Sequence, residues 1–341
     1  MPDRIPIVSI VMPTYNSGNT IRRSLESVRL QTIKADLVEV IIADGGSTDE
    51  TIEIAKSYNC NIIRNELVQP EYGKLVGLQA ARGRYVVFLD SDEVLIDRDS
   101  IAKKVALLEG ASGVRNVITA GLTNPVGYPP MNDYVNRFGE PFSFFMYGLD
   151  GGDYVASLRR RYQVTLDDES SLVVKFGAKD VLPICDGGGH CFDVDFLRQI
   201  VDISAAAVVP LIFSLMADRT QALGVIKGDF TEHYSTVSLL RLLKKIHWRI
   251  RSNVHRLTGI EGYVNREKRE PWTFRMKKFI FIPYALSVVF PLVDALGMCI
   301  RRRHAWYLMH VPLSIFTAVA ILWELGLKTL GFQPPLRAYG D

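Results

Sequence analysis

The chain has 341 residues, with 40 Lys and Arg against 37 Asp and Glu, and a formal net charge of +3. This small excess, gathered mainly in residues 241–275, favours a membrane surface over nucleic acid as the basic segment's partner. Four cysteines without regular spacing exclude a disulfide framework and suit a reducing compartment. The mean hydropathy of +0.10 is high for a purely soluble enzyme.

The N-terminal part of the chain alternates short apolar runs with amphipathic segments. We expect strands at 7–12, 38–43, 61–63 and 85–89, and helices at 21–30, 51–58 and 75–81. Strands that alternate with helices predict an α/β fold with a Rossmann-like, mostly parallel sheet flanked by helices. Ligands of such sheets bind outside the carboxyl ends of the strands. The sequence continues into the first strand directly from Met1, so we expect no cleavable signal peptide.

Polar clusters follow three of these strands. They are 13–16 (Pro-Thr-Tyr-Asn), Asp44 and 90–92 (Asp-Ser-Asp). Two carboxylates one residue apart present hard oxygen ligands at the end of a buried strand, which suit Mg²⁺ or Mn²⁺ together with substrate phosphates. Three polar clusters at one edge of a sheet predict a binding site there.

Three segments at this spacing resemble the signature blocks of family 2 glycosyltransferases: 9–16, 41–49 and 81–92. The resemblance covers roughly residues 5–240. It implies a GT-A fold, a nucleotide-diphosphate sugar as donor, and a divalent cation, Mg²⁺ or Mn²⁺, as cofactor. The donor-binding residues that it implies are Pro13, Thr14, Tyr15, Asn16, Asp44, Lys74, Asp90 and Ser91.

The resemblance also assigns individual roles. The residues at 13–15 would line the nucleobase pocket, and Asp44 would accept a hydrogen bond from the base. Asp90 would lie near the ribose and the metal, and Asp92 would ligate the metal. Lys74 would approach the nucleotide, although a solvated loop lysine is an equal alternative. His233 would be a third metal ligand or a diphosphate contact, with a plain surface histidine as the alternative.

A glycine-rich segment at 185–192 is similar to the segment that lines the acceptor side of these enzymes. The acceptor-side residues implied are Gly188, Gly189 and His190. A phosphate-binding loop is the competing interpretation, but no Lys followed by Ser or Thr supports it. The two cysteines and the histidine of this segment are too few for a tetrahedral metal site.

The expected catalytic base is missing from its usual place. Inverting members carry an acid about twenty residues after the glycine segment, where it deprotonates the acceptor hydroxyl. Here residues 205–213 are apolar. We therefore expect either Asp195 or Asp202 to act from a shifted position, or an acceptor phosphate that needs no base. A protein that binds the donor without efficient transfer is the remaining alternative.

The C-terminal third has a different composition. Residues 239–257 form a basic amphipathic pattern, which suits either an anionic membrane surface or packing on the preceding domain. A polar stretch at 259–271 indicates a linker. Two apolar segments follow, 279–300 and 305–327, and each has about the 20 residues that a membrane span needs.

Proline and one acidic residue occur in both apolar segments, and 301–304 (Arg-Arg-Arg-His) separates them. Two spans would place this basic loop outside the cell, against the positive-inside tendency. We therefore predict a bent, partly inserted hairpin with both ends and the arginine loop cytoplasmic. Two spans, or buried helices of a soluble protein, are the alternatives.

These observations predict three parts: a catalytic domain at 1–236, an amphipathic helix and linker at 237–275, and a membrane-associated hairpin at 276–330. The predicted function is transfer of a sugar, with inversion, to a lipid-linked acceptor at the cytoplasmic face of the inner membrane. That acceptor is a polyprenyl phosphate or a polyprenyl-diphosphate saccharide. We expect no nucleic-acid partner and leave a homo-oligomer open. A non-catalytic donor-binding subunit of a polysaccharide assembly machine is the alternative, and a nucleotidyltransferase is disfavoured because no Gly-rich basic loop follows the first strand.

Overall fold

The structure is a computed structural model. It describes residues 5–110, 113–148, 153–177, 180–183, 188–204, 209, 212–235, 238–255 and 270–334. The chain divides into two compact units. The first comprises Met1–Thr123, Tyr154–Ala178 and Cys185–Tyr234, and the second comprises Asn124–Asp153, Lys179–Ile184 and Ser235–Asp341. The last segment of the second unit thus starts next to the predicted boundary at 236, but 124–153 also belong to that unit.

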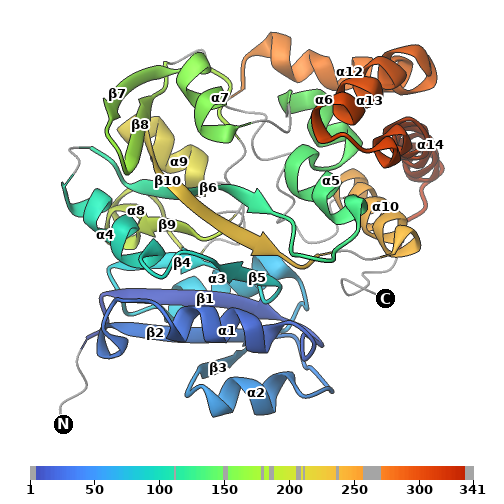
Figure 1. The fold of residues 1–341 in the computed structure, drawn as a ribbon. Helices are drawn as coiled ribbons and strands as arrows, with labels where there is room; N and C mark the ends of the chain where they lie inside the picture. Colours follow the sequence, from blue (N-terminus) through green and yellow to red (C-terminus); the bar gives the residue numbers. More distant parts are fainter. Residues whose placement is uncertain are drawn as a thin grey trace. The chain divides into compact units, whose positions relative to one another are not determined.

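The first unit is built on a ten-stranded sheet with the order β3-β2-β1-β4-β9-β6-β10-β8-β7, and β5 pairs with β10 (Figure 1). The strands are β1 (Val8–Thr14), β2 (Val38–Asp44), β3 (Asn61–Arg64), β4 (Tyr85–Phe88), β5 (Glu93–Leu95), β6 (Asn116–Thr123), β7 (Gln163–Asp167), β8 (Ser171–Lys175), β9 (His190–Asp193) and β10 (Ala222–His233). The first four strands pair in parallel, as the alternation of strands and helices predicted.

The helices of this unit are α1 (Ile21–Arg29), η1 (Ala35–Leu37), α2 (Thr51–Ser57), α3 (Pro70–Ala80), α4 (Ser100–Gly110), α7 (Tyr154–Arg161), α8 (Val194–Ile200) and α9 (Ile212–Thr220). The prediction for α3 was wrong at its start. The helix begins at Pro70, since proline is favoured in a first turn where its missing N–H costs nothing. Lys74 therefore lies in a helix and not in a loop.

The central strand β1 is buried along its whole length. Its alternate residues Val8, Ile10 and Met12 belong to one apolar cluster with Ile21 and Leu25 of α1. On the opposite face, Val11 belongs to a second cluster with Leu78 of α3. Helices therefore cover both faces of the sheet, which leaves the strand ends as the place where a ligand can be reached.

The second unit is helical. It contains α5 (Pro130–Phe138), α6 (Pro141–Tyr147), α10 (Leu239–His255), α12 (Trp272–Leu286), α13 (Val289–Arg302), η3 (Ala305–Met309) and α14 (His310–Thr329). Tyr134 and Phe138 of α5 pack with Leu242 and Ile246 of α10 and with Tyr307. The aromatic side chains of α5 and α6 thus form part of the apolar core of this unit. Most of the predicted linker at 259–271 lies outside the described residues.

One described helical stretch, Ala305–Thr329, is long and apolar enough to cross a membrane by length and composition. The pair α12 and α13 passes the same test only when taken together, and it is bent by 87° at its break. The bend lies at Val288, which has a φ of +62°. The first of the two predicted apolar segments, 279–300, therefore consists of two short arms and not one straight helix.

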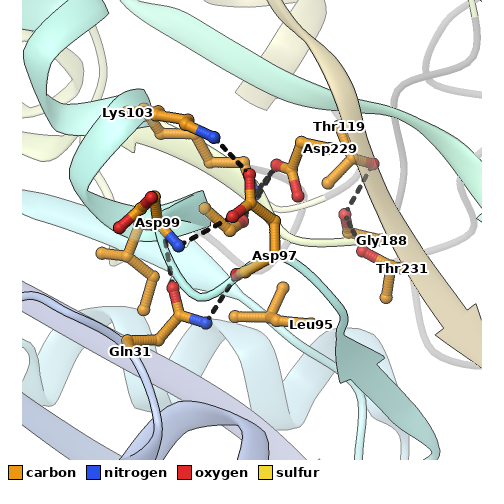
Figure 2. A network of polar contacts seen from close by, with 12 residues as sticks. Gln31, Leu95, Asp97, Asp99, Lys103, Thr119, Gly188, Asp229 and Thr231 are labelled. Carbon is orange, nitrogen blue, oxygen red and sulfur yellow. Dashed lines mark hydrogen bonds and ion pairs between the residues drawn. The ribbon is translucent and has the colours of Figure 1, made fainter.

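A fully buried ion pair stabilises the first unit beneath its sheet. Lys104 of α4 lies 3.1 Å from the Asp229 carboxylate, and neither side chain is exposed. Ser100 donates to the same Asp229 oxygen at 2.9 Å and accepts from Lys104 at 2.8 Å. Figure 2 shows Asp229 together with the neighbouring pair of Lys103 and Asp97. The two lysines are adjacent in sequence, but only Lys104 is buried.

We predict that Lys104→Met lowers the free energy of unfolding by about 3–5 kcal/mol, because it leaves the Asp229 charge buried without a partner. The matched variant Lys103→Met removes the partly exposed ion pair with Asp97, and it should lower the free energy of unfolding by at most about 1 kcal/mol. Chemical denaturation of both variants measures the difference. Equal stability losses for the two variants would show that the buried pair has no special structural role.

Candidate active site

The carboxyl ends of β1, β2 and β4 meet at one edge of the sheet. Thr14 at the end of β1 is in register with Asp44 at the end of β2. On the other side, Val11 of β1 is in register with Phe88 of β4, so that Asp90 follows two residues beyond that strand. The parallel pairing therefore brings the three predicted polar clusters together.

Asp44 organises the loop that follows β2. Its Oδ1 accepts from Thr14 Oγ1 at 3.0 Å and from Ser47 Oγ at 2.6 Å. Its Oδ2 accepts from the backbone N–H groups of Gly46 and Ser47 at 2.7 and 2.8 Å. These four bonds fill the usual lone-pair capacity of a carboxylate. In this state Asp44 holds the loop in shape, and its predicted bond to a nucleobase stays a prediction.

The loop after β1 is tied to both neighbouring loops. The Asn16 backbone N–H donates to Ser47 Oγ at 2.8 Å, and Asn16 Oδ1 accepts from the Thr48 N–H at 2.9 Å. Ser91 donates to Ser17 at 2.9 Å, which joins the end of β4 to the same loop. Tyr15 precedes these hydrogen-bonded residues, and about a third of its surface is exposed.

Helix α3 packs closely against Pro13. A Cβ built on Gly73 would lie 2.8 Å from the Pro13 Cβ, so only glycine allows the helix to approach this closely. The close approach places the first turns of α3 next to the end of β1. It also directs Lys74, the next residue of α3, toward the end of β4.

Lys74 forms an ion pair with Asp90, with 2.9 Å between Nζ and Oδ1. Its side chain is only 14 % exposed, so the alternative of a solvated lysine is wrong. Burial acts to lower the pKa of Lys74, but the charges of Asp90 and Glu93 outweigh it and raise that pKa. A permanent positive charge therefore lies at the carboxyl edge of the sheet.

Glu93 is a site residue that the sequence analysis missed. It is buried, and its carboxylate accepts from the Asp90 N–H at 2.9 Å and from the Gly188 N–H at 2.7 Å. Burial, together with the charge of Asp90, raises the pKa of Glu93 to about 7. The available signal was an acid that opens the apolar run of β5 directly after Asp92. Glu93 connects the polar end of β4 with the glycine segment.

Asp92 and His233 form the part of the site suited to a metal ion. His233 Nε2 lies 3.5 Å from Asp92 Oδ2, at the end of β10, and the Tyr234 N–H donates to the Asp92 carbonyl at 2.7 Å. No cluster of three or more His, Cys, Asp or Glu side chains poised for a metal occurs among the described residues. Mg²⁺ and Mn²⁺ are commonly held by one or two protein ligands together with substrate phosphates, so the Asp92 and His233 pair fits such an ion. Asp90, the other predicted ligand, is paired with Lys74 in this state.

The described part of the glycine segment is firmly held. Gly188 and Gly189 have φ values of +66° and +80°. The Gly188 carbonyl accepts from Thr119 at 2.9 Å and from Thr231 at 3.1 Å, as Figure 2 shows. His190 is buried, with Nε2 2.9 Å from Asn116 Oδ1. The glycines thus lie beside Glu93, whereas His190 packs inside the sheet.

The structure does not bring Asp195 or Asp202 to this edge. Strand β9 runs antiparallel to β4 and places Asp193 opposite Tyr85, at the amino end of β4. Helix α8 starts there, and its Asp195 forms an exposed ion pair with Arg198. Asp202 caps the Ser204 N–H at 2.9 Å and precedes Ile203, whose carbonyl accepts from Gln79 near the far end of α3. Most of the apolar window at 205–213 lies outside the described residues.

Comparison with known sequences identifies this arrangement. Residues 9–141 match the family described as Glycosyl transferase family 2, and this stretch holds the carboxyl ends of β1, β2 and β4. The chain contains a family 2 glycosyltransferase domain. The GT-A-type fold predicted from the sequence is therefore confirmed.

Relatives of this glycosyltransferase domain include poly(ribitol-phosphate) beta-N-acetylglucosaminyltransferase TarP of Staphylococcus aureus, 37 % identical over 98 residues. A PGL/p-HBAD biosynthesis glycosyltransferase of Mycobacterium bovis is 34 % identical over 109 residues. These matches cover 27 % and 30 % of this chain, and 30 % and 42 % of the two relatives. The chain thus matches less than half the length of either relative.

A solved structure agrees over nearly the whole chain. The mannosyltransferase PcManGT of Pyrobaculum calidifontis, in complex with GDP-Man and Mn²⁺, covers 95 % of this chain and 89 % of its own, with a TM-score of 0.51. The sequence identity is 16 %, so this likeness concerns the fold alone.

We predict that Glu93→Gln disturbs the site, because a single amide oxygen replaces the two oxygens that accept from Asp90 and Gly188. One buried N–H loses its partner, at a cost of about 1–3 kcal/mol in unfolding free energy. We also expect the affinity for Mn²⁺ in the presence of UDP or GDP to fall about tenfold or more, since Asp92 is held through this network. Calorimetry and Mn²⁺ electron paramagnetic resonance measure both effects.

The matched control is Glu39→Gln. Glu39 is also largely buried and accepts from Ser9 and Arg82, but it lies near the amino end of β2. Its substitution should lower stability while leaving Mn²⁺ and nucleotide binding unchanged. Equal effects of the two variants on binding would mean that Glu93 acts on stability alone.

Proposed function

We propose that this protein transfers a sugar, with inversion, from a nucleotide-diphosphate sugar to a lipid-linked acceptor at the cytoplasmic face of the cell inner membrane. The observation that carries the proposal is the convergence of Asp44, Lys74, Asp90, Asp92 and His233 at one edge of a family 2 glycosyltransferase sheet. The acceptor is a polyprenyl phosphate or a polyprenyl-diphosphate saccharide.

The donor end of the site is supported by geometry. Tyr15 and the loop ordered by Asp44 form the wall suited to a nucleoside, and Lys74 provides a buried cation near the end of β4. Relatives named as glycosyltransferases, and a neighbour solved with GDP-Man and Mn²⁺, support a nucleotide-sugar donor. The donor of this chain stays a proposal.

Asp92 and His233 would hold Mg²⁺ or Mn²⁺. A bound divalent cation neutralises the negative charge that develops on the diphosphate as the sugar leaves. The Lys74 ammonium adds a fixed positive charge at the same edge, and its ion pair with Asp90 orients it there. Glu93 holds the Asp90 backbone, so the acids remain in place while the substrate binds.

The positions of the acidic side chains favour a phosphate acceptor, because neither predicted base lies at the candidate site. Asp195 and Asp202 lie toward the amino end of β4, and the oxygens of Asp44 are already bonded within their loop. A polyprenyl phosphate is ionised at neutral pH, so its oxygen attacks the anomeric carbon without a general base. We therefore favour it over a hydroxyl acceptor that would need one.

A non-catalytic donor-binding subunit of a polysaccharide assembly machine is the second candidate function. It is favoured by the same observation, that the predicted base residues lie away from the site. Turnover separates the two functions, because a subunit that only binds the donor releases no sugar to any acceptor.

We predict that Asp92→Asn abolishes metal-dependent nucleotide release and sugar transfer, with a loss of about 100-fold or more. The measurement is transfer from UDP-, GDP- and dTDP-sugars with Mg²⁺ or Mn²⁺, in membranes that contain polyprenyl phosphate or polyprenyl-diphosphate saccharides. Asp97→Asn is the matched control, since Asp97 lies five residues further along and pairs with Lys103. Tight donor binding without turnover on any acceptor would favour the binding subunit.

A further inference from the structure

The second unit exposes a large apolar surface. Between residues 279 and 300, its exposed large hydrophobic side chains are Phe279, Ile280, Leu286, Val288, Val289, Phe290, Leu292, Val293, Leu296 and Ile300. We call this set the elbow surface, because it surrounds the bend between the two helices. Such side chains are few and scattered over the described part of the first unit: Ile5, Tyr15, Leu30, Ile96, Leu166 and Phe230. A contiguous apolar surface of this kind marks an interaction site.

The bend limits how deep the elbow surface can reach. The apolar part of α12 runs over 279–286 and that of α13 over 289–300, which correspond to arms of about 12 and 18 Å. Because the arms meet at 87°, the apex lies about 10 Å beyond the line that joins their outer ends. The hydrocarbon core of a bilayer is about 30 Å thick. The elbow therefore reaches into one leaflet and does not cross the membrane.

Cations mark the outer ends of both arms. Arg275, Lys277 and Lys278 precede the apolar part of α12, and Arg301, Arg302 and Arg303 follow that of α13. Within this unit, Lys277 donates to the Met146 carbonyl of α6 at 2.9 Å, and Arg302 pairs with Asp133 of α5 at 3.0 Å. The outer ends of the two arms are thus attached to α6 and α5, which are consecutive helices in the sequence. This arrangement places the cations at the headgroup level of an anionic leaflet.

The apolar helix α14 is fixed to the basic helix α10. Glu324 of α14 is fully buried and lies 2.7 Å from His247, 3.1 Å from Arg251 and 3.0 Å from His255. These three residues follow one another at intervals of four along α10, so one face of that helix packs on α14. Lys328 donates to the Val254 carbonyl, which extends the contact.

Helix α10 cannot enter the hydrocarbon core. It carries five Lys and Arg residues along its 17 residues, and charged side chains are costly there. Since Glu324 attaches α14 to it, both helices lie at the same depth, in the headgroup region. The length and composition of α14 would permit it to span a membrane, but its attachment to the basic helix α10 does not.

We propose that the second unit binds an anionic membrane as a wedge in a single leaflet, with the elbow surface inserted, α10 and α14 in the headgroup layer, and no described helix spanning. This inference rests on the proposed function for the presence of a membrane. The inference adds that the protein approaches a lipid-linked acceptor from within one leaflet.

The first test determines the side of the membrane on which the arginine loop lies. Arg303→Cys and Ser57→Cys are made in a chain whose Cys60, Cys185 and Cys299 are replaced, while Cys191 is kept because it is fully buried. Sealed inside-out and right-side-out membrane vesicles are then treated with an impermeant maleimide. We expect both new cysteines to react in the same vesicle preparation. Reaction of Arg303→Cys from the face opposite to Ser57→Cys would overturn the wedge.

The second test measures binding of the purified full chain to vesicles of phosphatidylglycerol and phosphatidylcholine. Phe290 is 62 % exposed, and Phe290→Glu should weaken binding about tenfold or more because its burial in lipid is lost. Ile96→Glu, at an exposed position of the first unit, is the matched control and should bind as the unchanged chain does. Equal binding of both variants, or no binding of the unchanged chain, would overturn the proposal.

Nucleotide-dependent Mn²⁺ binding, measured on the same variants, separates this inference from the proposed function. Phe290→Glu should retain it while losing vesicle binding. A chain that binds vesicles as expected but transfers no sugar refutes the proposed function and leaves the wedge intact.

Discussion

The parallel pairing of β1 with β2 and β4 is the constraint on which the site depends. Helices cover both faces of these strands, so every residue of β1 is buried and most of its side chains are apolar. The polar clusters at 13–16, Asp44 and 90–92 lie at the strand ends, and the parallel register brings those ends to one edge. The same burial that stabilises the sheet thereby collects the polar residues of the candidate site.

Negative charge dominates that edge, and the structure distributes it unequally. Asp44 is satisfied by hydrogen bonds within its loop, and Asp90 is neutralised by Lys74. Asp92 has His233 beside it, and Glu93 is buried between two backbone N–H groups. Repulsion between Asp90 and Glu93 raises the pKa of Glu93, after burial itself. A divalent cation at Asp92 and His233 would relieve this excess of negative charge, which is why the metal and the sugar diphosphate belong together in the proposed mechanism.

The first four strands, the helices between them and the meeting of the polar clusters could be predicted from the sequence, because each follows from local periodicity and from the geometry of parallel sheets. The start of α3 and the burial of Lys74 could not, since both depend on the close approach that Gly73 allows to Pro13. Glu93 escaped notice because only the folded chain places Gly188 against it. The shifted base was expected at Asp195 or Asp202, whose placement depends on the antiparallel direction of β9, which spacing alone does not reveal.

The C-terminal helices show why hydropathy alone does not decide membrane topology. Helix α14 is apolar enough to cross a bilayer, yet its one acid is buried against two histidines and an arginine of α10. Separating that acid from its partners inside lipid would leave a buried charge without compensation, and keeping them together would bring a strongly basic helix into hydrocarbon. Both are costly, whereas a position in the headgroup layer keeps the ion pairs and exposes the apolar side chains to acyl chains. The contacts of Glu324 therefore weigh more than the composition of the helix that carries it.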